Sequence, residues 1–351
     1  MQQQSPEEIA AARRIMACRD FMPLPVRFIF FLVIIVVYQF SGGIYMTSVS
    51  KMSGAMSWIS EDIMMAGYAS LVGLTVSFPF LFRIMFRFTA RQLLLCVTMI
   101  LIVGDYVCMI SDCVPLVVFL AFVCGFAKMV GTFICWSNIQ LNITPTRDFA
   151  VFFPFLFTFI LGCVQLVNIG TGYSIYAYDW QAMHRFTIVA LLIIFALQYF
   201  CMRRHFRQGP FIPFKGIDYI GCVIWSAFLM CVVFICVYGE HYDWLNGDEI
   251  PLALLFTIIL LGMGLYWAAY VEKPYIQIAT FKQHNMLWLF LLFGCMTLMS
   301  ATSGSLQNTF TGAILGYDTK HNIDLNWGSF VGVLFGAGFC FMGLVKWKWR
   351  I

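Results

Sequence analysis

Ten long runs of apolar residues alternate with short polar segments along most of the chain. Each run has roughly 20 residues, which is the length that an α-helix needs to cross a bilayer. This pattern predicts an all-α polytopic membrane protein. The expected spans cover residues 28–49, 62–82, 93–111, 115–141, 150–172, 185–202, 217–239, 250–271, 286–306 and 328–345.

The composition supports this interpretation. Of the 351 residues, 61% are apolar and only 11% are charged, whereas charged residues make up about 25% of a soluble domain. The thirteen cysteines form no CxxC pair and no cluster with histidine, so most of them are expected to act as small apolar side chains. We therefore expect the lipid bilayer as the main partner, no nucleic acid, no metal and no cofactor.

The distribution of lysine and arginine predicts the orientation. If the N-terminus is inside, 17 of the 21 cations fall on inner segments, and only Lys51, Arg185 and Lys320 fall outside. Such an excess is typical of cytoplasmic loops. The first run is also too long for a cleaved signal peptide. We expect a multi-pass protein of the plasma membrane (a bacterial inner membrane) with a cytoplasmic N-terminus.

Two polar inner segments divide the chain. The first contains two prolines and four cations between Arg203 and Lys215, and the second follows residue 271. The N-terminal segment has a helix-start pattern at Ser5, followed by arginines, which fits a short helix at the membrane surface or a solvated tail. The expected domains are a cytoplasmic N-terminal segment (1–26), a six-helix unit (27–202), a basic cytoplasmic linker (203–216), a pair of helices (217–271) and a last unit (272–351).

One span carries a lysine near its middle. Lys128 lies within the run 115–141, where a cation costs roughly 2.5–3.5 kcal/mol unless it faces a partner or water. Towards the inner end the same run becomes more polar at Trp136, Asn138 and Gln140. Two interpretations are open: Lys128 is paired inside the bundle, or this side of the helix lines a path for a solute.

The neighbouring span carries an acid, Asp105. The helical rise places Lys128 about 9 Å deeper than Asp105, a gap that a lysine side chain can largely bridge. We expect the two residues to form an interior pair, in which Asp105 is either the proton-coupling group or half of a static pair.

Amides form a second polar group in the spans. Gln165 and Asn168 are three residues apart on the fifth run, and Gln39 lies in the first. They are candidates for contacts with a solute or for hydrogen bonds between helices. The five histidines lie in expected loops or at span ends, and no set of histidines, carboxylates or Ser/His/Asp residues shares one depth. We therefore do not expect an enzyme.

Several short segments resemble one family of transporters. They are YGEHYDW (Tyr238–Trp244), FKGIDYIG (Phe214–Gly221), DWQAMHRF (Asp179–Phe186), PYIQIATFKQHN (Pro274–Asn285), LQNTFTGAILGYD (Leu306–Asp318), and the spacing of Tyr68 and Pro79. Together with the order of helices and inner loops, they make the chain similar to the 14-helix drug:proton antiporters of the major facilitator superfamily. The resemblance touches most of the chain.

The family's cytoplasmic loop motif after the second span is only partly kept. FRIMFRFTAR (Phe82–Arg91) contains Arg83, Arg87 and Arg91, but Phe86 stands where the family has an aspartate. In the fourth span Ala121 stands where the family has an arginine, and Lys128 could replace that cation two turns further along.

The resemblance implies a fold and a function. The six-helix unit would be the N-lobe, 217–271 the two linker helices, and 272–351 the first two helices of a truncated C-lobe, so the chain would be the N-terminal portion of a longer protein. The implied function is secondary active transport, with proton-coupled efflux of small lipophilic or drug-like solutes by antiport. The alternative is a non-transporting or truncated relative with a structural or regulatory role.

Overall fold

The structure is a computed structural model that describes residues 17–41, 44–143, 149–205, 217–281 and 283–345. Within those ranges the chain is helical, and its only β-pairing is a single bridge between Cys18 and Met202. Eight of the described helical segments are long and apolar enough to cross a membrane. The prediction of an all-α, multi-pass membrane protein is confirmed at this level. The expected helix start at Ser5 and the linker residues 206–216 lie outside the described ranges.

One of the ten expected spans falls short in the described part of the chain, because the helix Leu24–Phe40 has 17 residues. The expected span 286–306 lies within one helix of 26 residues, His284–Thr309. The expectation of one continuous helix over 28–49 is wrong, because the helix stops at Phe40 and Ser41 has extended backbone angles (φ −66°, ψ 124°). A new helix begins at Ile44.

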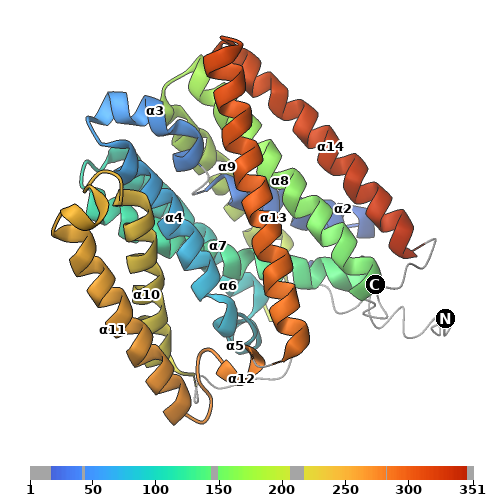
Figure 1. Ribbon diagram of the computed structural model, residues 1–351. Helices are drawn as coiled ribbons and strands as arrows, with labels where there is room; N and C mark the ends of the chain where they lie inside the picture. The colour runs from blue at the N-terminus through green and yellow to red at the C-terminus, as the bar shows by residue number, and fades with distance from the viewer. Residues whose placement is uncertain (1–16, 42–43, 144–148, 206–216, 282, 346–351) are drawn as a thin grey trace. The chain divides into compact units, whose positions relative to one another are not determined.

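The described residues belong to two compact units, one within 1–214 and 327–351 and the other within 215–326. The division falls inside the last helix, α14 (Thr319–Val345). The earlier helices of the first unit, shown in Figure 1, are α2 (Leu24–Phe40), α3 (Ile44–Met56), α4 (Ser60–Val76), η1 (Phe78–Phe80), α5 (Leu81–Arg87), α6 (Ala90–Ile110), α7 (Val114–Ile143), α8 (Phe149–Ala177) and α9 (Trp180–Cys201).

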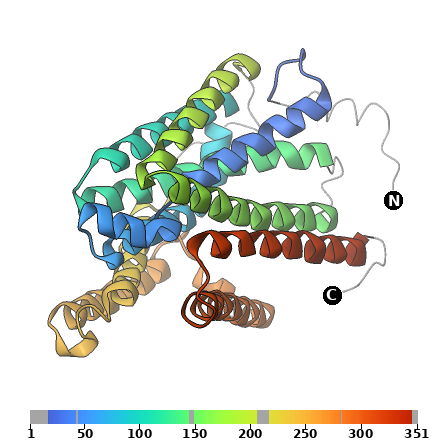
Figure 2. The same cartoon turned by 90° about the horizontal axis from the view of Figure 1, so that it is seen from above.

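Helix α7 is central to the first unit. It lies along α4, α6 and α2, and α6 in turn lies along α9, as the two views in Figures 1 and 2 show. Small residues allow α4 and α7 to approach closely, because a methyl group at Gly125 would overlap the carbonyl oxygen of Ser70 and one at Gly73 would overlap that of Phe122. Close packing through small residues is the usual way in which helices associate in a membrane.

The α-helix of the second span is interrupted near its proline. Pro79 has no N–H to donate and cannot continue an α-helical ladder. Helix α4 therefore ends at Val76, and the chain passes through η1 into the short α5, which ends at Arg87. The next helix starts with a reciprocal capping box, in which Thr89 accepts from the backbone N–H of Gln92 and the Gln92 side chain accepts from that of Thr89.

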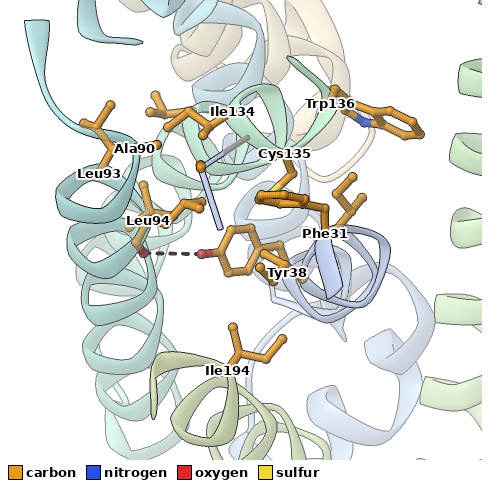
Figure 3. Close-up of a cluster of buried hydrophobic side chains, with 14 of the residues drawn as sticks. Phe31, Tyr38, Ala90, Leu93, Leu94, Ile134, Cys135, Trp136 and Ile194 are labelled. Carbon is orange, nitrogen blue, oxygen red and sulfur yellow. Dashed lines mark hydrogen bonds between the residues drawn. The ribbon is translucent and has the colours of Figure 1, made fainter. Parts of the chain in front are cut away.

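A buried hydrogen-bond network lies at the core of the first unit. The hydroxyls of Tyr38 on α2 and Thr98 on α6 lie 2.7 Å apart, and the Gln198 side chain on α9 donates to Tyr38 at 2.9 Å. The Thr98 hydroxyl is also 2.9 Å from Gln198 Oε1. Figure 3 shows the Tyr38 hydroxyl directed at the carbonyl oxygen of Leu94, among apolar side chains from α2, α6, α7 and α9. We refer to Tyr38, Thr98 and Gln198 as the amide–hydroxyl network.

The second unit contains α10 (Tyr219–Tyr238), η2 (Trp244–Asn246), α11 (Glu249–Tyr270), α12 (Ile278–Phe281), α13 (His284–Thr309) and η3 (Phe310–Ile314). Helices α10 and α11 lie side by side. Asp218 caps α10 by accepting from Gly221 N at 2.8 Å, and it also accepts from Trp267 Nε1 at 2.8 Å and Tyr275 N at 3.0 Å. One carboxylate therefore ties both helices to the segment that follows them.

Candidate functional site

Asp105 is a buried acid near the C-terminal end of α6. Its residue exposure is 4%, although it lies in a helix that the sequence marks as a span. Its Oδ1 is 3.6 Å from Nδ1 of His184, and its Oδ2 has no hydrogen-bond partner within the described residues. A buried carboxyl with an unused oxygen is costly unless it carries a proton or meets water.

His184 is the partner that the sequence did not indicate. The sequence predicts it at a span end, because the apolar run begins at residue 185. The helix α9 begins earlier, at Trp180, and His184 is completely buried in its second turn. The rings of Tyr45 and Trp180 lie edge-on to it, with centroids 6.0 Å away in each case. Neither imidazole nitrogen has a hydrogen-bond partner in the described part of the chain.

Lys128 does not form the expected direct pair with Asp105. Its Nζ instead donates to the carbonyl oxygen of Ser41 at 3.1 Å, where α2 ends. The four terminal carbonyls of a helix lack partners within it and carry partial negative charge, so the break at Ser41 offers a ligand to a cation. Asp105 still acts on Lys128 electrostatically, and both side chains are buried. The expected interior pair is thus a looser group of three ionisable residues.

Two further buried side chains, on α3 and α9, belong to the surroundings of these three ionisable residues. Tyr45 on α3 shares a side-chain hydrogen bond with Cys108, which lies one turn after Asp105 on α6. Thr187, one turn after His184, is buried and its hydroxyl has no hydrogen-bond partner among the described residues. We call Asp105, Lys128 and His184 the ionisable cluster. It is assembled by α6, α7 and α9.

The other predicted residues of α7 lie nearer its C-terminal end. Trp136 lies edge-on to three phenylalanine rings of α8, the nearest being Phe159 at 5.5 Å between centroids. Asn138 is fully buried and donates to the Ile134 carbonyl of its own helix at 2.8 Å. Gln140 is half-buried at the inner end of the helix. On α7 these three side chains lie eight to twelve residues beyond Lys128, which is roughly 12–18 Å along the helix axis.

The remaining amides are half-buried. Gln165 and Asn168 lie on α8, and Gln39 lies in the last turn of α2. Their role as contacts for a solute stays a prediction.

The arginines of the loop motif occupy different surroundings. Arg83 and Arg87 are half-buried on α5. Arg91, in the first turn of α6, is buried, and its guanidinium lies over the ring of Tyr199 at 4.5 Å from the centroid. This cation–π contact joins the start of α6 to the end of α9.

Comparisons with known proteins add no identification. No protein-family model matches the chain, and none of the curated proteins compared with it matches either. Within the ranges that the structure describes, no group of three or more His, Cys, Asp or Glu side chains could hold a metal ion.

Proposed function

We propose that the chain is part of a secondary active transporter that exports small lipophilic solutes in exchange for protons. The observation that carries this proposal is the ionisable cluster, in which a buried Asp105 and a buried His184 face each other at 3.6 Å inside helices long enough to span a bilayer. Ionisable residues in such positions are rare and are usually retained for a function.

The cluster has the chemical parts that proton coupling needs. A proton taken up by the Asp105–His184 pair would be shared between a carboxylate oxygen and an imidazole nitrogen, the side-chain type that gains and loses protons near neutral pH. The Lys128 ammonium on α7 would attract the carboxylate whenever Asp105 is deprotonated. Release of the proton would strengthen that attraction, and binding would weaken it.

The fold that we propose for the longer protein follows the resemblance to the major facilitator superfamily. The helices from α2 to α9 would form an N-lobe, with its N-terminus in the cytoplasm of a bacterial cell. Alternating access would then require movement of this lobe against a second one. The aromatic and amide side chains of α7 and α8, including Trp136 and Gln165, would face the solute only after such a movement.

A second function is favoured by one contact. Lys128 joins α7 to the end of α2 through Ser41 O. Such a contact can hold two helices together without any exchange of protons. On this alternative the chain is a non-transporting relative, and the ionisable cluster fixes helix positions without exchanging protons.

A flux assay distinguishes the two. Purified full-length gene product in proteoliposomes should accumulate or release a fluorescent lipophilic cation faster when a pH gradient is imposed. Asp105→Asn should reduce the gradient-driven rate at least tenfold, whereas Asp112→Asn, at an exposed acid just beyond α6, should not change it. Equal rates for the wild type with and without the gradient, or for Asp105→Asn and the wild type, would favour the structural alternative.

A further inference from the structure

The start of the described chain is paired with the segment that follows α9. Arg19 N donates to Cys201 O and Arg203 N donates to Ala17 O, each at 2.9 Å, which forms the bridge between Cys18 and Met202. Cys18 is fully buried there, and burial raises the pKa of its thiol to about 12. The pairing is therefore packed against the core and brings two arginine-rich segments together.

The pairing concentrates positive charge at one spot. Among the described residues, those that line a depression of about 430 Å³ are Arg19, Arg203, Arg204 and His205. Asp20 is the acid beside them, and its Oδ1 binds Arg203 and lies 3.9 Å from Arg27. Two arginines thus share one carboxylate.

The other three lining residues lack an acidic partner within the described part of the chain. Arg19, Arg204 and His205 are exposed and have no ion pair with any described side chain. The depression lies immediately after Cys201, the last residue of a candidate span, at the level where a membrane-crossing helix leaves the hydrocarbon core. Guanidinium groups bind phosphate oxygens through two parallel hydrogen bonds, and basic pockets beside spans bind anionic head groups.

We propose that this depression, which we call the arginine pocket, binds a phosphate-bearing anion, either the head group of an anionic lipid or a free phosphate compound. Arg19 and Arg204 supply the phosphate contacts from the two paired segments. Arg203 is oriented by Asp20 and contributes charge. Because one ligand contacts both segments, binding stabilises their pairing and holds the beginning of α2 to the end of α9.

Retention of lipid by the purified protein tests whether the arginine pocket binds an anionic head group. The purified full chain, in detergent with equal amounts of phosphatidylglycerol and phosphatidylcholine, is examined by native mass spectrometry and by thermal unfolding. The wild type should retain phosphatidylglycerol at least fivefold over phosphatidylcholine, and Arg19→Gln/Arg204→Gln should abolish that preference. Lys273→Gln, at an exposed cation elsewhere, should keep it.

The free compound is tested in parallel. Inorganic phosphate and glycerol phosphate are added to the lipid-free chain, and a rise in the unfolding midpoint that the double variant lacks would assign the pocket to a soluble phosphate ligand. A shift with lipid alone would assign it to a head group. Absence of both responses in the wild type, or equal responses in the wild type and the double variant, would overturn the proposal.

A folding control keeps the result interpretable. Maleimide labelling at pH 8, located by peptide mass mapping, should leave Cys18 unmodified in the wild type and in both variants. Arg204→Lys provides a milder change, because it keeps the charge but loses the planar fork. It should retain a preference between those of the wild type and the double variant, and a preference equal to that of the double variant would overturn the proposed role of charge.

Discussion

The first unit contains two buried polar groups that both join α6 to α9, but in different ways. The amide–hydroxyl network links α2, α6 and α9, and its Gln198 side chain both donates to Tyr38 and lies within hydrogen-bond distance of Thr98. The ionisable cluster also joins α6 to α9, but Asp105 Oδ2 and both nitrogens of His184 lack partners among the described residues. Thr98 and Asp105 lie on one face of α6, about 10 Å apart along its axis.

The difference separates two uses of polarity inside a membrane protein. Neutral side chains that satisfy each other's hydrogen bonds hold helices together without leaving a buried polar atom unpaired. Buried ionisable side chains whose donor or acceptor atoms have no hydrogen-bond partner raise the free energy of the folded state. Protonation or hydration can relieve that cost. We therefore expect substitutions in the network to change stability, and substitutions in the cluster to change proton-coupled activity.

The largest effect is expected at His184. His184→Gln keeps a polar side chain but cannot exchange a proton, so the gradient-driven flux should fall at least tenfold and lose most of its dependence on external pH. The assay is proteoliposome flux at a series of external pH values. His241→Gln, at an exposed loop histidine, is the control and should behave like the wild type. An unchanged pH profile for His184→Gln would contradict the assignment of the cluster to proton exchange.

Replacement of aspartate by asparagine at Asp218 and at Asp105 compares an acid with three hydrogen bonds to the acid of the ionisable cluster. Asp218 accepts three hydrogen bonds, so Asp218→Asn should lower the unfolding free energy by about 1–2 kcal/mol. Asp105→Asn should change it by less than about 0.5 kcal/mol, because no well-formed hydrogen bond is lost. Thermal and denaturant unfolding in detergent provide the measurement. Asp248→Asn, at a helix cap without a side-chain hydrogen bond, serves as the reference, and a larger loss at Asp105 than at Asp218 would reverse the distinction.

The amide–hydroxyl network should respond through stability alone. Gln198→Leu removes the donor to Tyr38 and should lower the unfolding free energy by about 1 kcal/mol, within the range for hydrogen bonds between membrane helices. The flux per folded molecule should stay within about twofold of the wild type. Gln181→Leu changes an exposed glutamine on the same helix and should not affect stability. A tenfold loss of flux in Gln198→Leu would mean that the network belongs to the transport machinery.

The smallest effect on stability is expected at Lys128. Lys128→Gln removes the charge but keeps an N–H that can reach Ser41 O, so the unfolding free energy should change by less than about 0.5 kcal/mol. Lys128→Leu removes the donor too and leaves that carbonyl unpaired. It should be the less stable of the two in the same unfolding assay. Equal stability of both variants would show that the contact with Ser41 O does not hold α2 to α7.

The lengths of apolar runs were enough to predict most helices of the fold. The runs that became α6, α7, α10 and α11 agree with the observed helices to within a few residues. The break after Phe40 was not predicted, since the apolar pattern continues through it. The local signal was there in Ser41 and the two glycines that follow it, because such residues favour turns.

The site was only partly predictable. Lone charges in long apolar runs drew attention to Asp105 and Lys128, and both are buried. Their partners could not be predicted in the same way. Ser41 contributes a backbone carbonyl that exists only because a helix ends there, and His184 reaches Asp105 because α9 begins five residues earlier than its apolar run. Contacts between residues 79 positions apart depend on how the helices pack, which periodicity along one helix does not specify.

The close approach at Gly73 and Gly125 limits how the first unit can change shape. Where two backbones touch, sliding or separating the helices would expose polar peptide groups to lipid. Helices α4 and α7 are therefore expected to travel as one rigid body. Any opening that admits a solute has to form along a different pair of helices.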